Sequence, residues 1–155
     1  MVSSKISGFT LLELVIVMVI VGGYMLFHSP AHEKYLMRTK RVDAKKALVN
    51  LWHEQEVYQQ TCGRYAAIIA ANTTCVTGST KESDFTLKAS NISPKGYYQL
   101  SVVSATATTY TLQAVPMADK QQAKDINCAK LTLDNVGTKQ SFNHQNQPTA
   151  ECWQK

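Results

Sequence analysis

The sequence lacks the motifs by which most enzymes are recognised. It contains no glycine-rich phosphate loop, no nucleophile elbow and no pair of carboxylates in a supporting context. Its many serines and threonines are not arranged with histidine. We therefore expect a protein that is not an enzyme, with no catalytic residues and no bound cofactor.

Closely spaced cysteines and acidic loops are also missing. No Cys-x-x-Cys pair occurs, so redox catalysis and zinc knuckles are unsupported. No acidic calcium loop occurs either, because Asp119 and Asp125 flank a segment rich in lysine and glutamine. We therefore expect no metal site.

Charge is almost absent from one stretch of the chain, since Glu13 is the only charged residue between Phe9 and Phe27. This run has about the minimum length for a membrane span. A carboxylate in hydrocarbon is costly, so Glu13 needs a partner or a function. A secretory signal has its small-residue cleavage site after the apolar region, whereas here Gly8 precedes it. We therefore predict a leader that ends at Gly8, followed by a retained helix.

The length of 155 residues supports a single domain, and the part outside the apolar run is large enough for one modest core. The net charge of +5 is mildly basic, and loss of Lys5 with a leader lowers it by one. Four cysteines lie after the apolar run, which favours two disulfides in an oxidising compartment. Three pairings are open, and we prefer Cys62–Cys75 with Cys128–Cys152 because it closes the shortest loops.

Residues 9–60 are predicted to form one long helix. Beyond the apolar run, apolar residues recur at three- and four-residue spacing and indicate one buried face: Ala44, Ala47, Leu48, Leu51 and Tyr58. Gly22 and Gly23 each weaken the helix by about 1 kcal/mol, and Pro30 costs about 3 kcal/mol in a helix interior. We therefore expect a kink or local melting between these glycines and Pro30.

A loop is predicted over residues 61–81, and short candidate strands follow it at 85–88, 97–103, 110–115, 131–133 and 139–142. The linker 104–108 predicts an antiparallel hairpin. The expected fold class is α+β, with a long N-terminal helix packed on an antiparallel sheet of three to five strands.

The segment Gly8-Phe9-Thr10-Leu11-Leu12-Glu13-Leu14, behind a leader with one basic residue, resembles the type III signal of type IV pilins and of type II secretion pseudopilins. Pro30 also falls where these pilins carry a helix-bending proline. The segments Cys128–Gly137 and Cys152-Trp153 resemble the sheet edge and closing disulfide of a minor pilin. The resemblance implies the ladle-shaped pilin fold.

In that family a prepilin peptidase cuts after the glycine and methylates the new N-terminal phenylalanine, here Phe9. The resemblance also implies that Glu13 pairs with the methylated amine of a neighbouring subunit. Opposite charges attract strongly in a low-dielectric bundle, so this pair fixes the stagger of the subunits. The simpler alternative is a lone glutamate that stays neutral in lipid.

The resemblance implies three segments: a leader over 1–8, a transmembrane and assembly helix over 9–30, and a periplasmic globular domain over 31–155. The basic residues between Lys34 and Lys46 conflict with this orientation under the positive-inside rule. The cysteines and the leader argue for it, and we follow them. The expected location is the inner membrane before assembly and an extracellular pilus afterwards.

We predict a structural subunit of a type IV pilus, most simply a minor pilin, serving motility, adhesion or DNA uptake. Its expected partners are other pilins, the prepilin peptidase and the inner-membrane assembly platform. A secretion pseudopilin, a fibre-tip protein that binds DNA or a surface ligand, and a single-span protein that never polymerises are the alternatives. The cluster Lys34–Lys46 is expected to be solvated or to form salt bridges between subunits, so the DNA signal is weak.

Overall fold

The computed structural model describes residues 8–27 and 30–154, and the chain divides into two compact units after Leu36. Two helices come first, α1 (Leu11–Phe27) and α2 (Pro30–Cys62). These helices cover most of the helix expected over residues 9–60, and residues 28–29 between them lie outside the described residues. Pro30 is the first residue of α2, a position that tolerates proline because the first turn has no internal partner for its missing N–H group.

A membrane span is expected over the apolar run, but α1 has only 17 residues. In the described residues 8–27 and 30–154, no helix is both long and apolar enough to cross a membrane.

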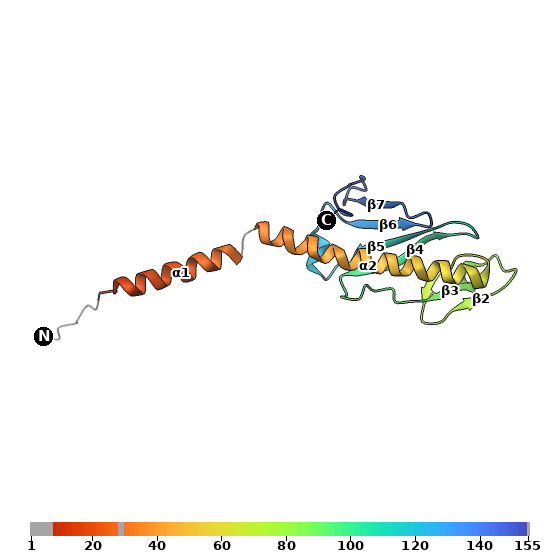
Figure 1. Ribbon diagram of the computed structural model, residues 1–155, viewed down its shortest axis with the longest axis horizontal. Helices are drawn as coiled ribbons and strands as arrows, with labels where there is room; N and C mark the ends of the chain where they lie inside the picture. Colours follow the sequence, from red (N-terminus) through yellow and green to blue (C-terminus); the bar gives the residue numbers. More distant parts are fainter. Residues whose placement is uncertain (1–7, 28–29, 155) are drawn as a thin grey trace. The chain divides into compact units, whose positions relative to one another are not determined.

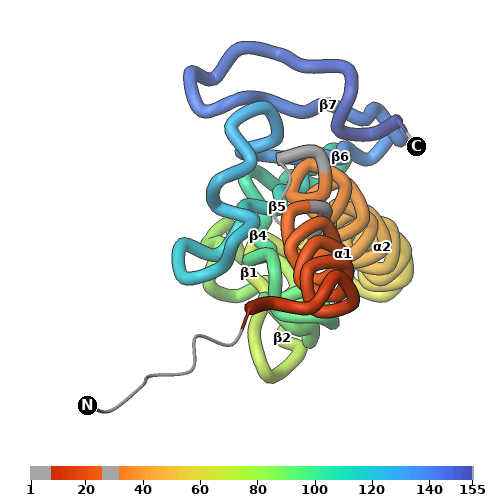
Figure 2. Tube along the Cα trace, turned by 90° about the vertical axis from the view of Figure 1, so that its left-hand side faces the viewer, coloured from red at the N-terminus to blue at the C-terminus, as the bar shows by residue number. Residues whose placement is uncertain are grey.

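The second unit is built on a four-stranded sheet with the order β4-β5-β6-β7. Its strands are β4 (Tyr98–Ala105), β5 (Tyr110–Pro116), β6 (Lys130–Asp134) and β7 (Lys139–Phe142), and each pairs with its neighbour in antiparallel register. Figure 2 shows β4, β5 and β6 beside one flank of α2. This sheet confirms the predicted hairpin and the α+β class.

The core lies between α2 and this sheet. All five residues of the predicted apolar face of α2 are buried, and they meet buried residues on alternate positions of the strands, including Tyr98, Leu100, Tyr110 and Leu112. Buried residues recur every three or four positions on the helix and every second position on the strands. A helix packed on one face of a sheet requires this spacing.

A second sheet has three strands in the order β1-β3-β2, at the end of the unit where α2 stops (Figure 1). It consists of β1 (Ile68–Ala70), β2 (Thr74–Cys75) and β3 (Phe85–Lys88), with β1 parallel and β2 antiparallel to β3. The prediction of a loop throughout residues 61–81 was wrong here. Strands of three and two residues are too short to show a period, and their pairing depends on β3.

Two single turns of 3₁₀ helix complete the unit, η1 (Glu82–Asp84) and η2 (Gln121–Lys124). The η2 turn lies in the connection between β5 and β6, and it supplies the residues that hold the first turns of α2 in this unit.

Candidate functional site

The N-terminal candidate residues lie at the start of α1. Thr10 caps this helix, because the Glu13 N–H donates to Thr10 Oγ1 at 3.3 Å and the Leu14 N–H donates to the Thr10 carbonyl at 3.2 Å. Thr10-x-x-Glu13 therefore has the sequence of a capping box, and a carboxylate in the first turn is favoured by the helix dipole. The sequence contained this signal, and the charge of Glu13 in the first turn of α1 is favourable for the helix beside its expected intersubunit role.

Gly8 and Phe9 precede the helix, and Phe9 is 82% exposed. Gly22 and Gly23 lie inside α1, which continues through both. A Cβ atom at either glycine would meet nothing within 4 Å. Packing within this chain therefore does not require glycine at these two positions.

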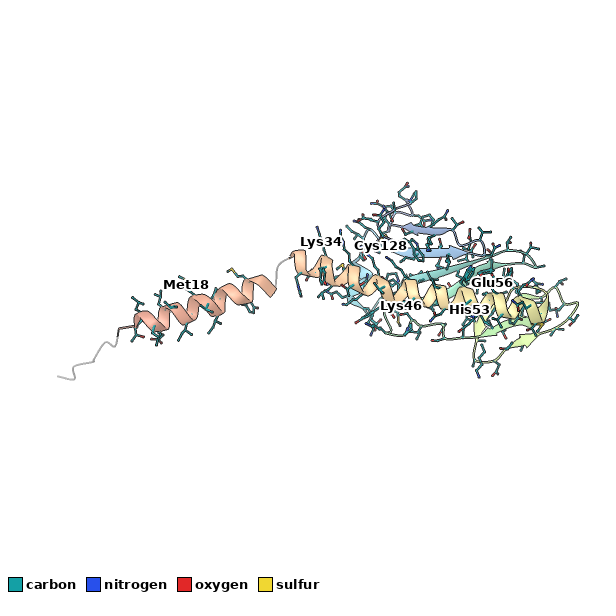
Figure 3. All side chains as sticks on the ribbon, in the orientation of Figure 1. Met18, Lys34, Lys46, His53, Glu56 and Cys128 are labelled. Carbon is teal, nitrogen blue, oxygen red and sulfur yellow. A yellow bond between two sulfur atoms is a disulfide. The ribbon has the colours of Figure 1, made fainter. Side chains whose placement is uncertain are left out.

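The structure joins Cys62 to Cys75 and Cys128 to Cys152, the pairing that closes the shortest loops. The first bond links the last residue of α2 to β2, with the Cα atoms 5.8 Å apart. Cys128 and Cys152 are fully buried, and they attach the C-terminal tail to the core beside α2 (Figure 3).

The basic residues of α2 do not form one solvated face. The Arg41 guanidinium donates to both carboxylate oxygens of Asp125 at 2.7 and 2.8 Å, and both residues are buried. Gln122 of η2 donates a further bond to Asp125 Oδ2 at 3.0 Å. The Lys40 ammonium donates to Gln121 Oε1 at 2.8 Å and lies 5.2 Å from the centre of the Tyr97 ring.

Asp43 holds the loop before β4 on the same part of α2. Its carboxylate accepts hydrogen bonds from the Ser93 hydroxyl and from the Lys95 backbone N–H, the latter at 3.1 Å. The Arg41 and Asp43 contacts therefore fasten both ends of the β4–β5 hairpin region to α2, and their role is structural.

Lys45 and Arg38 face a different feature, a cavity of about 260 Å³ between α2 and the C-terminal tail. Glu151 and Trp153 line its other side. The Lys45 ammonium donates to the Gln154 carbonyl at 2.8 Å. Lys139 of β7 lies 5.8 Å from the centre of the Trp153 ring, whose indole N–H donates to the Gln140 carbonyl at 2.7 Å.

The cations around this cavity repel one another. Burial lowers the pKa of Lys45, and the nearby charges of Arg41 and Lys139 lower it further. Arg41 is neutralised by Asp125, whereas the ammonium of Lys45 is bonded to a neutral carbonyl. The cavity therefore has an excess of positive charge.

Four cations of this unit lie over aromatic rings: Lys40 over Tyr97, Arg64 over Phe85, Lys130 over Phe142 and Lys139 over Trp153. These contacts are not visible in the order of the residues along the sequence. The members of each pair are 12 to 57 positions apart in the sequence. The antiparallel register of β6 and β7 sets Lys130 opposite Phe142. Only the fold brings them together.

A second concavity, of about 280 Å³, lies beside the last turns of α2, where Glu56 and His53 are found (Figure 3). Its lining is mainly apolar and includes Val57, Tyr58 and Leu87. Tyr58 donates a hydrogen bond to the Thr74 carbonyl, so its hydroxyl is already bonded. Within the part of the chain that the structure describes, no group of three histidine, cysteine or acidic side chains is placed to hold a metal.

Comparison with known proteins gives two family matches. The family described as "Type IV minor pilin ComP, DNA uptake sequence receptor" matches residues 30–132, more than half of the chain. The prokaryotic N-terminal methylation motif matches residues 3–22. No curated protein matches this chain.

Among the solved structures similar to this chain are two pilins. The non-core minor pilin PilV of Neisseria meningitidis has 16% identity and a TM-score of 0.49, over 73% of this chain and 93% of that one. A type IV pilin from Shewanella oneidensis has 21% identity and a TM-score of 0.41, over 77% of this chain and 99% of that one.

Proposed function

We propose that this chain, which belongs to the family of the type IV minor pilin ComP, the DNA uptake sequence receptor, binds double-stranded DNA for uptake. It is a minor pilin subunit of a type IV pilus, as the family match and the methylation motif establish. Association with other pilins and processing by a prepilin peptidase follow from that membership.

The observation that carries the DNA-binding proposal is the family match over residues 30–132, which spans α2, both sheets up to β6 and the η2 turn. The chemistry of the surface agrees with it. The chain has a net charge of +5, and four of its cations lie against aromatic rings. Cations neutralise backbone phosphates, and this interaction supplies most of the sequence-independent affinity for DNA.

Fluorescence anisotropy of a labelled DNA duplex tests the proposal, with the full processed chain in detergent micelles. We expect the logarithm of the binding constant to fall linearly with the logarithm of the salt concentration between about 50 and about 200 mM. A labelled polyglutamate of equal net charge controls for nonspecific attraction to anions. Binding to the peptide as tight as to DNA, or no binding to either, would overturn the proposal.

A strain without the gene provides the matching test in cells. The expected phenotype is loss of DNA uptake while surface fibres persist, because a minor subunit is not the bulk of the fibre. Full uptake in this strain would contradict a receptor role and would leave only a structural role in the pilus.

We further propose the processing and assembly scheme that the N-terminus favours. The leader 1–8 is removed after Gly8, Phe9 is N-methylated, and residues 31–155 form the periplasmic domain. The apolar segment 9–27 holds the precursor at the inner membrane until the assembly platform adds it to the fibre. Mass spectrometry of sheared fibres should find a peptide that begins at N-methylated Phe9, and its absence from fibres would contradict the scheme.

In the assembled fibre, Glu13 pairs with the methylated amine of a neighbour, and the stretch from Gly22 to Pro30 bends or melts. Residues 28–29, in the middle of this stretch, lie outside the described residues, so the second point rests on the low helix propensity of glycine and proline. Glu13→Gln keeps the side-chain shape and removes the charge, so it should abolish incorporation into fibres without affecting processing. Normal incorporation of this variant would contradict an intersubunit role for the Glu13 charge.

A further inference from the structure

The cavity between α2 and the C-terminal tail has more cations than anions around it. In the lining, Arg38 is exposed, Lys45 is half-buried and Glu151 is the acidic residue. Lys139 is exposed and lies beside the lining, over the ring of Trp153. Glu151 also accepts a hydrogen bond from Asn127 at 3.2 Å. Arg41 does not add to this excess of positive charge, because its Nε and Nη2 atoms donate to the two carboxylate oxygens of Asp125.

The fold maintains this imbalance. The buried Cys128–Cys152 bond fixes the tail, and Trp153 is held by its bond to the Gln140 carbonyl. The tail cannot withdraw, so Lys45 stays close to Arg41 and Lys139 although their charges lower its pKa. An anion in the cavity would relieve this repulsion.

We propose that this cavity is where the protein contacts the backbone phosphates of DNA, through Arg38, Lys45 and Lys139, with Trp153 as its apolar wall. The proposal rests on the DNA-binding function proposed above and assigns it a site. Arg38 and Lys45 lie within the range of the family match, whereas Lys139 and Trp153 lie beyond it.

The spacing of the cations favours a polyanion over a single acidic side chain. Arg38 and Lys45 are seven residues apart on α2, which corresponds to a rise of about 10 Å. A single carboxylate cannot contact two cations this far apart, whereas a DNA strand presents one phosphate at every base pair. A guanidinium also binds phosphate in a fork, as Arg38 is free to do on its exposed side.

Anisotropy titrations with a DNA duplex test the site, using the full processed chain. The double variant Lys45→Gln, Lys139→Gln should weaken binding for every sequence and lower the slope of log affinity against log salt by about two. The matched control is Lys81→Gln, Lys88→Gln, which removes the same charge from exposed positions at the β3 end of the unit. Arg38→Gln is a second test at an exposed position where folding is not at risk.

The outcomes separate the site from the function. Suppose that the wild type binds DNA, and that the double variant of Lys81 and Lys88 loses affinity while the double variant of Lys45 and Lys139 does not. The proposed site is then wrong, and the proposed function stands. If the wild type does not bind DNA, the function itself fails. If the cavity variants bind DNA normally but are lost from sheared fibres, the cavity receives an acidic group of a neighbouring subunit, and the proposal is overturned.

Discussion

Arg41 and Lys45 lie one turn apart on α2, yet their surroundings differ. Arg41 faces η2, where it is buried and paired with both oxygens of Asp125. Lys45 faces the C-terminal tail, where it is half-buried and bonded to a neutral backbone carbonyl beside an open cavity. The first region has its charges balanced within the chain, and the second does not.

The difference distinguishes a cation that the fold requires, Arg41, from a cation that is available for binding, Lys45. A buried cation without its carboxylate is strongly destabilising, so the pairing around Arg41 is a condition of folding. A partly exposed cation costs little, because water screens it, and it remains available to an external anion. Neighbouring positions of one helix therefore serve different purposes, and substitutions should tell them apart.

Arg41→Ala is expected to have the largest effect. It leaves the carboxylate of Asp125, which is 4% exposed, buried without a cation. Loss of one partner from such a pair costs about 3–5 kcal/mol. Urea unfolding followed by circular dichroism measures it, and Lys46→Ala, an exposed change on the same helix, should alter stability by less than about 0.5 kcal/mol. Equal stability of the two variants would remove the distinction between the regions.

The Cys128–Cys152 bond should come next, because it fixes both regions. The two cysteines are separated by 24 positions, and loop entropy predicts a loss of roughly 3.5 kcal/mol when both are replaced by alanine. For Cys62 and Cys75, separated by 13, the same relation gives roughly 3 kcal/mol. Urea unfolding compares the pairs. Trp153 fluorescence should change only when the C-terminal bond is removed, and a change with the other pair would contradict its local role.

The pH dependence of the two regions should have opposite signs. Burial raises the pKa of Tyr98 well above its usual value, and the Asp125 carboxylate raises it further. The folded state therefore keeps the Tyr98 proton longer than the unfolded state, and stability falls as pH rises above about 10, by up to about 1.4 kcal/mol per pH unit. Lys45 has a lowered pKa, so its contribution to stability rises as pH approaches 10.5.

Unfolding measured between pH 8 and pH 11 separates these effects. Tyr98→Phe should flatten the alkaline loss of stability, since the titrating hydroxyl is gone. An unchanged alkaline slope in this variant would assign the loss to another tyrosine, such as Tyr110, whose pKa is also raised by burial and by its bond to Glu56.

Sequence alone predicted the parts of this protein that depend on short-range pattern. The apolar face of α2 follows from its three- and four-residue spacing, and the strands of the larger sheet follow from local composition. The segment from Gly8 to Leu14 identified the family, and the methylation-motif match over 3–22 agrees with it.

The cavity could not be predicted in the same way. Its lining comes from α2 and the tail, and Lys139 of β7 lies beside it over the Trp153 ring. Nothing in the order of these residues along the sequence indicates their proximity. The basic cluster on α2 was visible as charge, but its division into a paired side and an unpaired side depends on where Asp125 and the tail pack. The short strands β1 and β2 were missed for a related reason, because the residues of β3 with which they pair lie ten or more positions away.

Lys45→Gln is expected to have the smallest effect on stability, and this expectation is the sharpest test of the comparison. The substitution removes a bond from a half-buried ammonium to a neutral carbonyl, and loss of the charge relieves the repulsion from Arg41 and Lys139. This relief offsets the lost ammonium bond, so the free energy of unfolding at pH 7 should change by less than about 0.5 kcal/mol. Urea titration beside Arg41→Ala measures the difference. A loss as large as that of Arg41→Ala would mean that Lys45 is itself a structural cation, and an anion could then not bind it without destabilising the fold.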